Sequence, residues 1–232
     1  YAYVDVDAAT GQVNALGTDA IKVGIFYRPA AATPLGSPAA LNTGAFGLYT
    51  TTNGVTQRNR PALAQSFQQV GTSARVTVVA NHLKSKGSAC DDNLSPVGSD
   101  PDVGDGQGNC NLTRTAAAAQ LLSWLGGHPT GVNTPNVLVM GDLNSYALED
   151  PIVTLTAAGY VNLIADRLGP LAYSYVFDGQ WGYLDHALAA AALAPQVRAV
   201  AEWHINADEP NVLDYNTNFK SPAQVASLYA AD

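Results

Sequence analysis

Short apolar runs that end in polar residues recur along this chain and predict a β-sheet. The clearest run covers residues 137–140, where Val-Leu-Val-Met stops at Gly141, as expected of a buried strand. In residues 21–27 apolar and polar positions alternate, which is typical of a strand with one buried face. Further strands, the third and fourth forming a hairpin, are predicted over residues 60–67, 74–80, 173–177, 183–188 and 197–203.

Two helices are predicted between these strands. The longer one covers residues 116–125, is capped by Thr113 or Thr115, and ends at a glycine pair. The shorter one begins at Asp150-Pro151, because proline suits the first position of a helix.

The order of these elements predicts the class of fold. Residues 30–44 are rich in Ala, Pro, Thr and Gly and are expected to form a loop. Strands and helices interleave elsewhere, which favours helices packed on sheets in an α/β or α+β sandwich. No linker divides the chain, so we expect one domain over residues 1–232.

Charge and length narrow the possible partners. The chain has 11 Lys and Arg against 19 Asp and Glu, a net charge of −8 and a pI near 4.7. This excludes an affinity that rests on a broad basic surface, but not an enzyme that meets phosphate at one local site. No apolar run approaches the length of a membrane span, so we expect no membrane partner, and we expect a monomer. The start at Tyr1, without a Met, is typical of a mature or truncated piece.

Cys90 and Cys110 enclose a polar, turn-forming segment that little besides a covalent clip would hold. A disulfide between them would remove roughly 3 kcal/mol of loop entropy from the unfolded state. One bridge in an acidic, lysine-poor chain favours an exported, extracellular protein. The alternative is two unrelated free cysteines.

The same segment carries acidic residues among glycines, which can bind a structural Ca²⁺. Their spacing fits no defined calcium-binding loop, so the alternative is a solvated loop held by the disulfide. The residues are Asp91, Asp92, Asp100, Asp102 and Asp105.

Asp142 and Asn144 follow the strand at 137–140 and stand two residues apart. In an extended segment such residues point the same way. A carboxylate suits a hard divalent cation, and an amide beside it can contact a phosphate oxygen. We therefore interpret the pair as a metal site for Mg²⁺ or Mn²⁺, against the alternative of a polar turn.

Two more strand ends carry candidate catalytic residues. His82 follows the strand at 74–80 and can donate to a phosphate oxygen or act as a general acid. Asp185 lies in the strand at 183–188 and can orient a catalytic histidine. Taken singly, either residue can equally be structural.

The few basic residues of the first half are candidates for contacts with a phosphate backbone, with little base specificity expected. Each of them, considered alone, can equally be a solvated surface residue. The candidates are Arg60, Lys84, Lys86 and Arg114.

Taken in order, these motifs resemble the endonuclease/exonuclease/phosphatase superfamily, of which DNase I is a familiar member. The central motifs are Asn81-His-Leu-Lys-Ser-Lys, then Gly141-Asp-Leu-Asn-Ser, then Tyr183-Leu-Asp-His. Flanking segments are similar to the secreted bacterial extracellular nucleases, and the resemblance covers nearly the whole chain. The flanking segments are residues 18–29, 59–65, 90–110, 113–115 and 203–210.

The resemblance implies a four-layer α/β sandwich of two packed mixed sheets and metal-dependent hydrolysis of nucleic-acid phosphodiesters, in DNA or RNA. His82 resembles the family's strand-end catalytic histidine, and Asp142 with Asn144 resembles its pair that positions metal and phosphate. Asp185 resembles the aspartate that orients a second histidine. The alternatives are a phosphomonoesterase or an inositol-phosphate or phospholipid phosphodiesterase on the same fold, or a non-catalytic module.

Two family elements have no counterpart in this sequence. The metal-binding glutamate lies in a segment before anything present here, and the final Ser-Asp-His motif would follow Asp232. His186 is not a substitute, because Ala-Leu-Ala-Ala follows it rather than a proline-rich strand end. We therefore expect a domain that is incomplete at both ends and is inactive if isolated in this form.

Overall fold

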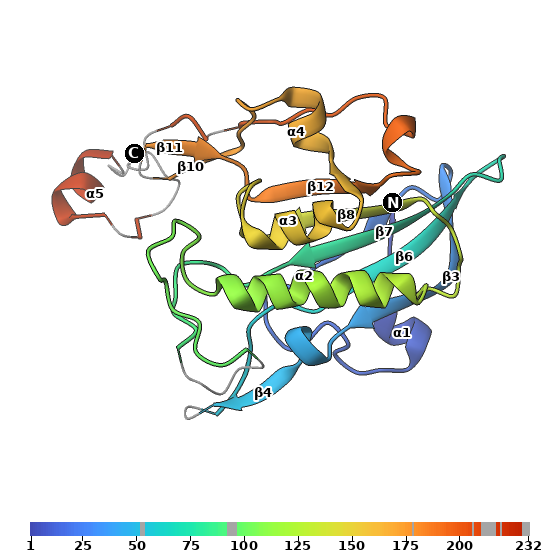
Figure 1. Cartoon of the computed structure of the whole chain (residues 1–232), viewed down its shortest axis with the longest axis horizontal. Helices are drawn as coiled ribbons and strands as arrows, with labels where there is room; N and C mark the ends of the chain where they lie inside the picture. The colour runs from blue at the N-terminus through green and yellow to red at the C-terminus, as the bar shows by residue number, and fades with distance from the viewer. Residues whose placement is uncertain are drawn as a thin grey trace.

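The computed structural model of the chain describes residues 1–51, 54–91, 97–177, 179–205, 207–209, 217–218 and 220–228. A six-stranded mixed sheet lies at its centre (Figure 1). The pair β7–β8 is parallel, and the other four neighbouring pairs are antiparallel. In spatial order the strands are β3 (Ala32–Leu41), β6 (Ala62–Gln69), β7 (Arg75–His82), β8 (Val137–Asp142), β12 (Asp185–Ala190) and β9 (Tyr160–Asn162).

Two helices cover one face of this sheet, as Figure 1 shows: α2 (Asn111–Gly126) and α3 (Asp150–Ala157). They bury apolar side chains that alternate along the strands, since a strand turns every second side chain to the same face. Val79, Val139 and Leu188 on the sheet meet Leu121 and Ile152 on the helices, and all five are almost completely buried. This layer contains the main core.

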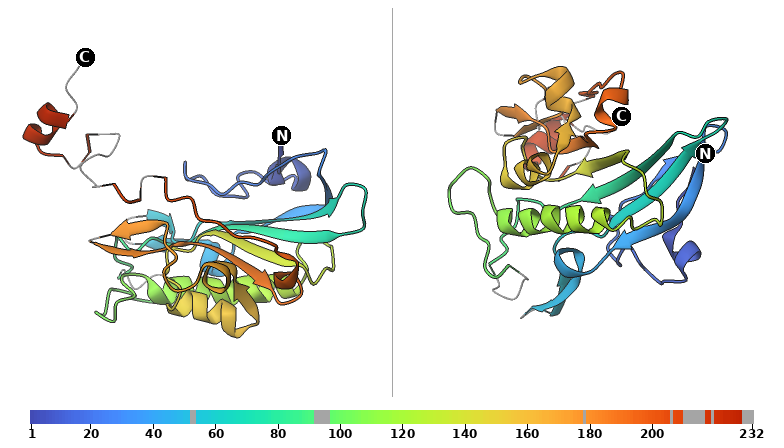
Figure 2. Two further views of the ribbon diagram at one scale, coloured as in Figure 1. Left: turned by 90° about the horizontal axis from the view of Figure 1, so that it is seen from above. Right: turned by 45° about the vertical axis from the view of Figure 1, so that its right-hand side comes forward.

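The opposite face is covered at its two sides by separate segments (Figure 2). The N-terminal segment packs Val6 and Ile25 against Leu63 and Phe67 of β6. The other side carries α4 and the short helix η2, which pack around Ala189 of β12. The elements of these segments are β1 (Ala2–Tyr3), α1 (Val6–Thr10), β2 (Phe26–Tyr27), α4 (Leu163–Leu168) and η2 (Ala194–Gln196).

The remaining elements lie outside the central sheet. Hairpins β4–β5 and β10–β11 are two-stranded. No helix in the described part of the chain is long and apolar enough to cross a membrane. The bounds are η1 (Gly44–Phe46), β4 (Leu48–Thr51), β5 (Gly54–Gln57), β10 (Tyr175–Phe177), β11 (Gln180–Gly182) and α5 (Pro222–Leu228).

The α/β class and the helix-flanked mixed sheet are confirmed. The described residues form one large sheet and three two-stranded sheets, so a second large sheet is not among them. Strands predicted over residues 60–67, 74–80 and 137–140 correspond to β6, β7 and β8, and the helix predicted at Asp150-Pro151 to α3.

Several local predictions were wrong. Residues 30–44, expected to be a loop, contain the edge strand β3, where prolines are tolerated because one side of the strand has no partner. The hairpin forms between β10 and β11, while β12 joins the central sheet instead. The segment 21–27 contains only the two-residue strand β2. The segment 197–203 contains no strand.

The start of α2 also differs from the prediction. The helix begins at Asn111, before Thr113 and Thr115. The carboxylate of Asp100 accepts from the backbone amides of Leu112 and Thr113, at 3.1 and 2.7 Å. An aspartate from the preceding segment therefore stabilises the first turn in place of a threonine cap.

Candidate active site

Three of the predicted residues form one row across neighbouring strands. Asp142 on β8 is the register partner of His82 on β7 and of Asp185 on β12. Residues directly opposite one another in a sheet point to the same face. The row therefore brings an imidazole and two carboxylates together at the ends of three strands, on the face opposite α2.

Glycine at position 141 is what allows strands β7 and β8 to approach here. Gly141 has φ +124°, and a Cβ on it would lie 2.1 Å from the carbonyl oxygen of Asn81, its register partner. No other residue fits this space or this backbone conformation without strain. The glycine of the Gly-Asp-Leu-Asn motif thus holds Asp142 and His82 at the same level.

Asn144 does not continue the strand geometry that the sequence predicted. Strand β8 ends at Asp142, and Asn144 has φ +48°. Its backbone amide donates to Oδ1 of Asp142 at 2.8 Å, and its side-chain amide donates to the Leu83 carbonyl at 2.9 Å. The tight turn redirects the Asn144 side chain into a neighbouring cleft rather than parallel to Asp142.

The row is electrostatically strained. Burial raises the pKa of Asp142 above its ordinary value. Burial also raises the pKa of Asp185, and the charge of Asp142 raises it further. The pKa of His82 is lowered by burial and then by Arg60, and its Nε2 lies 3.6 Å from Oδ2 of Asp142. The imidazole is therefore largely neutral at pH 7. It does not supply a positive charge to balance the two carboxylates.

Arg60 is the cation beside this row. Its backbone amide donates to the His82 carbonyl at 3.1 Å, which fixes it next to the end of β7. Its guanidinium pairs with Asp19 at 3.3 Å and donates to the Ile21 carbonyl. Its charge lowers the pKa values of both His82 and Asp142, although burial is the larger effect on each. Arg60 thus remains a candidate contact for a phosphate.

The two lysines, Lys84 and Lys86, follow the end of β7. Lys84 is half-buried, and burial followed by the nearby arginines lowers its pKa to about 8. Its ammonium group donates to the hydroxyls of Ser85 and Ser88. Lys86 pairs with Glu149 and lies over the Tyr146 ring, 4.5 Å from the centroid. Lys86 lines the cleft, where it can meet an anion, and Lys84 stays a candidate phosphate contact from the sequence.

Arg114 cannot serve as a surface phosphate contact, because it is completely buried. Its guanidinium donates to the carbonyls of Lys84, Asn109 and Gln107 and to the hydroxyl of Ser145, at 2.7–3.2 Å. Arg114 instead joins helix α2 to the loops around the site, a role that the sequence did not indicate.

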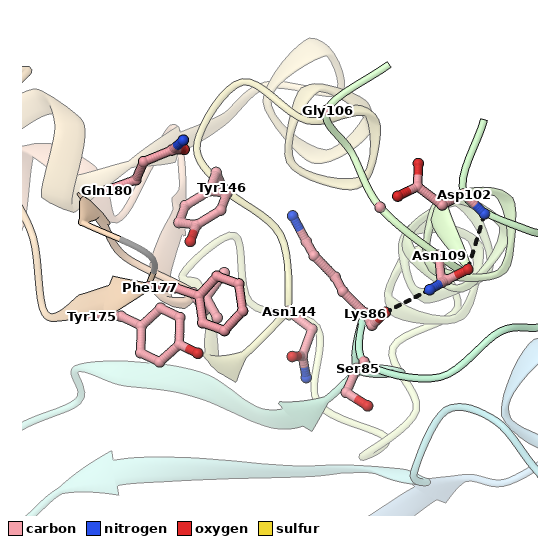
Figure 3. Close-up of a pocket in the computed structure, with 13 residues that line it drawn as sticks. Ser85, Lys86, Asp102, Gly106, Asn109, Asn144, Tyr146, Tyr175, Phe177 and Gln180 are labelled. Carbon is pink, nitrogen blue, oxygen red and sulfur yellow. Dashed lines mark hydrogen bonds between the residues drawn. The ribbon is translucent and has the colours of Figure 1, made fainter. Parts of the chain in front are cut away.

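A cleft of about 600 Å³ opens next to the row, with Asn144 on its lining (Figure 3). One side consists of the rings of Tyr146, Tyr175 and Phe177. The other side is Lys86 and the loop that contains Asp102, Gly106 and Asn109. Tyr175 and Phe177 were predicted only as part of the strand over residues 173–177, and Tyr146 had no predicted role. Their alternation in Tyr-Ser-Tyr-Val-Phe was the available signal.

The donors in the row suit a hard cation only in part. Two adjacent carboxylates with raised pKa values favour a positive charge between them. In the described part of the chain, however, no three His, Cys, Asp or Glu side chains cluster as a metal site. Asp142 and Asp185 are thus the available carboxylates, and Mg²⁺ or Mn²⁺ bound there would keep several water ligands.

The disulfide between Cys90 and Cys110 is present in the structure, with a Cα–Cα distance of 5.4 Å. Three of the acidic residues within the loop are engaged in local hydrogen bonds: Asp100 accepts from the start of α2, Asp102 accepts from Gly104, and Asp105 accepts from Gln107. Asp92 lies outside the described residues. A structural Ca²⁺ therefore remains only a prediction from the sequence.

No family model and no curated protein matches the chain. Among similar solved structures, the human Nocturnin catalytic domain with bound sulfate is 15% identical, with a TM-score of 0.47, 72% of this chain and 51% of that chain being covered. A Bacteroides thetaiotaomicron protein is 12% identical (TM-score 0.46, coverage 72% and 53%). D. rerio TDP2 complexed with a single-strand DNA product is also 12% identical (TM-score 0.43, coverage 75% and 60%).

The chain spans between about half and three fifths of the length of these structures. The B. thetaiotaomicron protein carries the description endonuclease/exonuclease/phosphatase family protein, as does a further match from Bacteroides vulgatus. The structural neighbours thus include proteins of the family that the sequence motifs resemble.

Proposed function

We propose that the protein containing this chain hydrolyses phosphodiester bonds in nucleic acid with the help of a divalent cation. The observation that carries the proposal is the row of His82, Asp142 and Asp185, three register partners beside Arg60. A general base or acid, a pair of carboxylates that can hold a cation and a guanidinium can each assist the attack of water on a phosphate ester.

In this proposal a water oxygen loses a proton and bonds to phosphorus, and the bond between phosphorus and one ester oxygen breaks, with the leaving oxygen taking up a proton from solvent. His82, held largely neutral, can donate from one ring nitrogen to a phosphate oxygen and accept a proton at the other. Arg60 neutralises part of the negative charge that develops on the phosphate oxygens. Asp185 shares the charge of the row with Asp142 and would orient the second histidine that the family resemblance implies.

Two carboxylates would repel a phosphate unless a cation lay between them. Mg²⁺ or Mn²⁺, when held between Asp142 and Asp185, would polarise the phosphate and stabilise the leaving oxygen, and the Asn144 amide would contact the phosphate from the cleft. The substrate is DNA or RNA, contacted through its backbone by Arg60, Lys84 and Lys86. The disulfide supports an extracellular location for the protein.

The alternative is hydrolysis of small phosphate esters on the same scaffold. A net charge of −8 disfavours long polyanions, and a cleft of about 600 Å³ is large enough for a small ligand. A substrate panel separates the two functions. Release of inorganic phosphate from monoesters without strand scission would favour the alternative.

The direct test is cleavage of a supercoiled plasmid and of labelled oligonucleotides by the purified chain, with Mg²⁺, with Mn²⁺ and with EDTA. From the longer parent protein we expect nicking that EDTA abolishes and that Asp142→Asn removes, and from the isolated chain, which lacks two family elements, we expect none. Asp166→Asn, a surface carboxylate of α4 paired with Arg167, is the matched control and should retain activity. Nicking that persists in Asp142→Asn would refute the assignment. If the chain is folded but inactive, the same pair of variants is compared in the longer parent protein.

A further inference from the structure

The cleft beside the row has two chemically different walls, as Figure 3 shows. Hairpin β10–β11 and Tyr146 form one wall, and the loop over residues 102–109 with Lys86 forms the other. Its volume of about 600 Å³ is in the usual range for sites that enclose a small organic group.

The aromatic wall presents flat, solvent-exposed rings. Tyr175 and Phe177 stand two residues apart on β10, so they share one face, and their rings are inclined by only 9° with centroids 6.3 Å apart. These side chains are 40% and 55% exposed. Tyr146 adds a third ring, which packs closely on Gly182: a Cβ on that glycine would lie only 2.8 Å from Cδ1 of the Tyr146 ring. Exposed parallel rings are suited to stack on a flat partner.

The opposite wall is polar and held in place. Both polar atoms of the Asn109 side chain are engaged, accepting from the Asp102 amide and donating to the Lys86 carbonyl. The Lys86 side chain is fixed between Glu149 and the Tyr146 ring. A ligand in the cleft therefore meets π faces on one side and charged or hydrogen-bonding groups on the other.

A nucleobase has this combination of a flat π surface and a polar edge. An aliphatic side chain would place no polar atom against the charged and hydrogen-bonding wall, and a sugar or phosphate alone would not use the rings. Asn144 connects the cleft to the row, because it lines the cleft and its backbone amide donates to Oδ1 of Asp142. A base in the cleft would thus belong to a nucleotide next to a phosphate held at the row.

We infer that the cleft binds one unpaired nucleobase adjacent to the scissile phosphate, so that single-stranded or locally unpaired nucleic acid is the preferred substrate. A paired base is stacked between its neighbours and has its edge occupied, so it must leave the duplex to enter. The link to a scissile phosphate rests on the proposed function, whereas base binding itself does not.

The test is a binding measurement in EDTA, which prevents metal-dependent cleavage. Fluorescence anisotropy compares a labelled single-stranded oligonucleotide with an abasic strand of the same length and charge. We expect the base-containing strand to bind about tenfold more tightly. Phe177→Ala should lose about tenfold on the base-containing strand only, and Phe177→Trp should restore the affinity. Trp181→Ala is the control, since Trp181 pairs with Val176 on the opposite face of the hairpin and should have no effect.

The outcomes separate the two proposals. Equal affinity of the wild-type chain for both strands, or an equal loss on both strands in Phe177→Ala, would overturn the inference. A cleavage assay on the same strands tests the function. Binding that prefers bases without any hydrolysis, in the chain and in its longer parent, would refute the proposed function and leave the cleft assignment standing. Hydrolysis of both strands at equal rates would support the proposed function and overturn the cleft assignment.

Discussion

Asp142 and Asp185 oppose each other directly across the antiparallel strands β8 and β12. Like charges in this position repel, and the pKa of Asp185 is raised by burial and by the charge of Asp142. If only stability mattered here, a neutral or positively charged side chain at one of these two positions would be more favourable. The pair therefore has the energetic character of a functional site.

Substitution of Asp185 should separate stability from activity. Asp185→Asn removes the repulsion while keeping the size of the side chain, so we expect the free energy of unfolding to rise by up to about 1 kcal/mol. Hydrolysis of phosphodiesters should fall about 10- to 100-fold, because the orientation of the site is lost. Urea unfolding and initial rates on one protein preparation measure both. A loss of stability with unchanged rates would mean that Asp185 is structural.

Gly141 should tolerate no side chain. Gly141→Ala would place a methyl group 2.1 Å from the Asn81 carbonyl oxygen, and we expect a loss of more than about 3 kcal/mol in the free energy of unfolding. Gly159→Ala is the control: its φ of +95° is also positive, but no atom lies within 4 Å of the added Cβ. We expect it to cost about 1–2 kcal/mol. Similar losses in both variants would show that close strand contact is unimportant.

Replacement of Arg114 should destabilise the chain strongly. Arg114→Ala leaves three carbonyl oxygens and the Ser145 hydroxyl without their donor, so we expect a loss of about 3 kcal/mol or more. Arg75→Ala, at an exposed position on β7, should change the free energy of unfolding by less than about 0.5 kcal/mol. Hydrogen exchange should also show faster exchange in residues 102–109. Unchanged exchange there would contradict the role of Arg114 in holding that loop.

His186 should make the fold sensitive to acid. Burial lowers its pKa from the ordinary 6.5 to about 4, while its Nε2 donates to the Ser145 carbonyl at 2.7 Å. As pH falls from 6.5 to 4, the unfolded chain binds a proton that the folded chain does not, so stability is lost in this window. Above pH 6.5 His186 causes no such loss, and below pH 4 the loss in the free energy of unfolding reaches roughly 3 kcal/mol.

His186→Gln tests this contribution, because glutamine keeps an N–H donor but does not titrate. The difference in the free energy of unfolding between pH 7 and pH 4 should shrink by roughly 3 kcal/mol in the variant. Thermal or urea unfolding at several pH values gives this difference. The same acid sensitivity in both proteins would assign it to other groups.

The sequence predicted those parts of the fold that depend on local pattern. Strands β7 and β8 were identified because Val-rich runs have strong strand preference and end at polar residues. Strand β3 was missed, since its prolines and alanines resemble a loop and only pairing with β6 makes it a strand. Tertiary context decides such segments.

The sequence predicted which residues belong to the candidate site, but not how they are arranged in space. His82, Asp142 and Asp185 were each identified from their strand ends, yet their register depends on pairings between segments far apart in the chain. The burial of Arg114 and the aromatic wall of the cleft depend in the same way on long-range packing. No local pattern carries that information.

The hydrogen bonds of Arg114 have a consequence for communication within the molecule. The loop that forms the polar wall of the cleft has few apolar side chains of its own, and it takes its position from an arginine rooted in helix α2. Helix α2 in turn packs on the sheet that carries the row of His82, Asp142 and Asp185. A displacement of α2 along the sheet would thus be transmitted through Arg114 to the Asn109 end of the loop and would reshape the cleft. The hydrogen bonds between Gln107 and Asp150 at the start of α3 form a second connection between core and cleft.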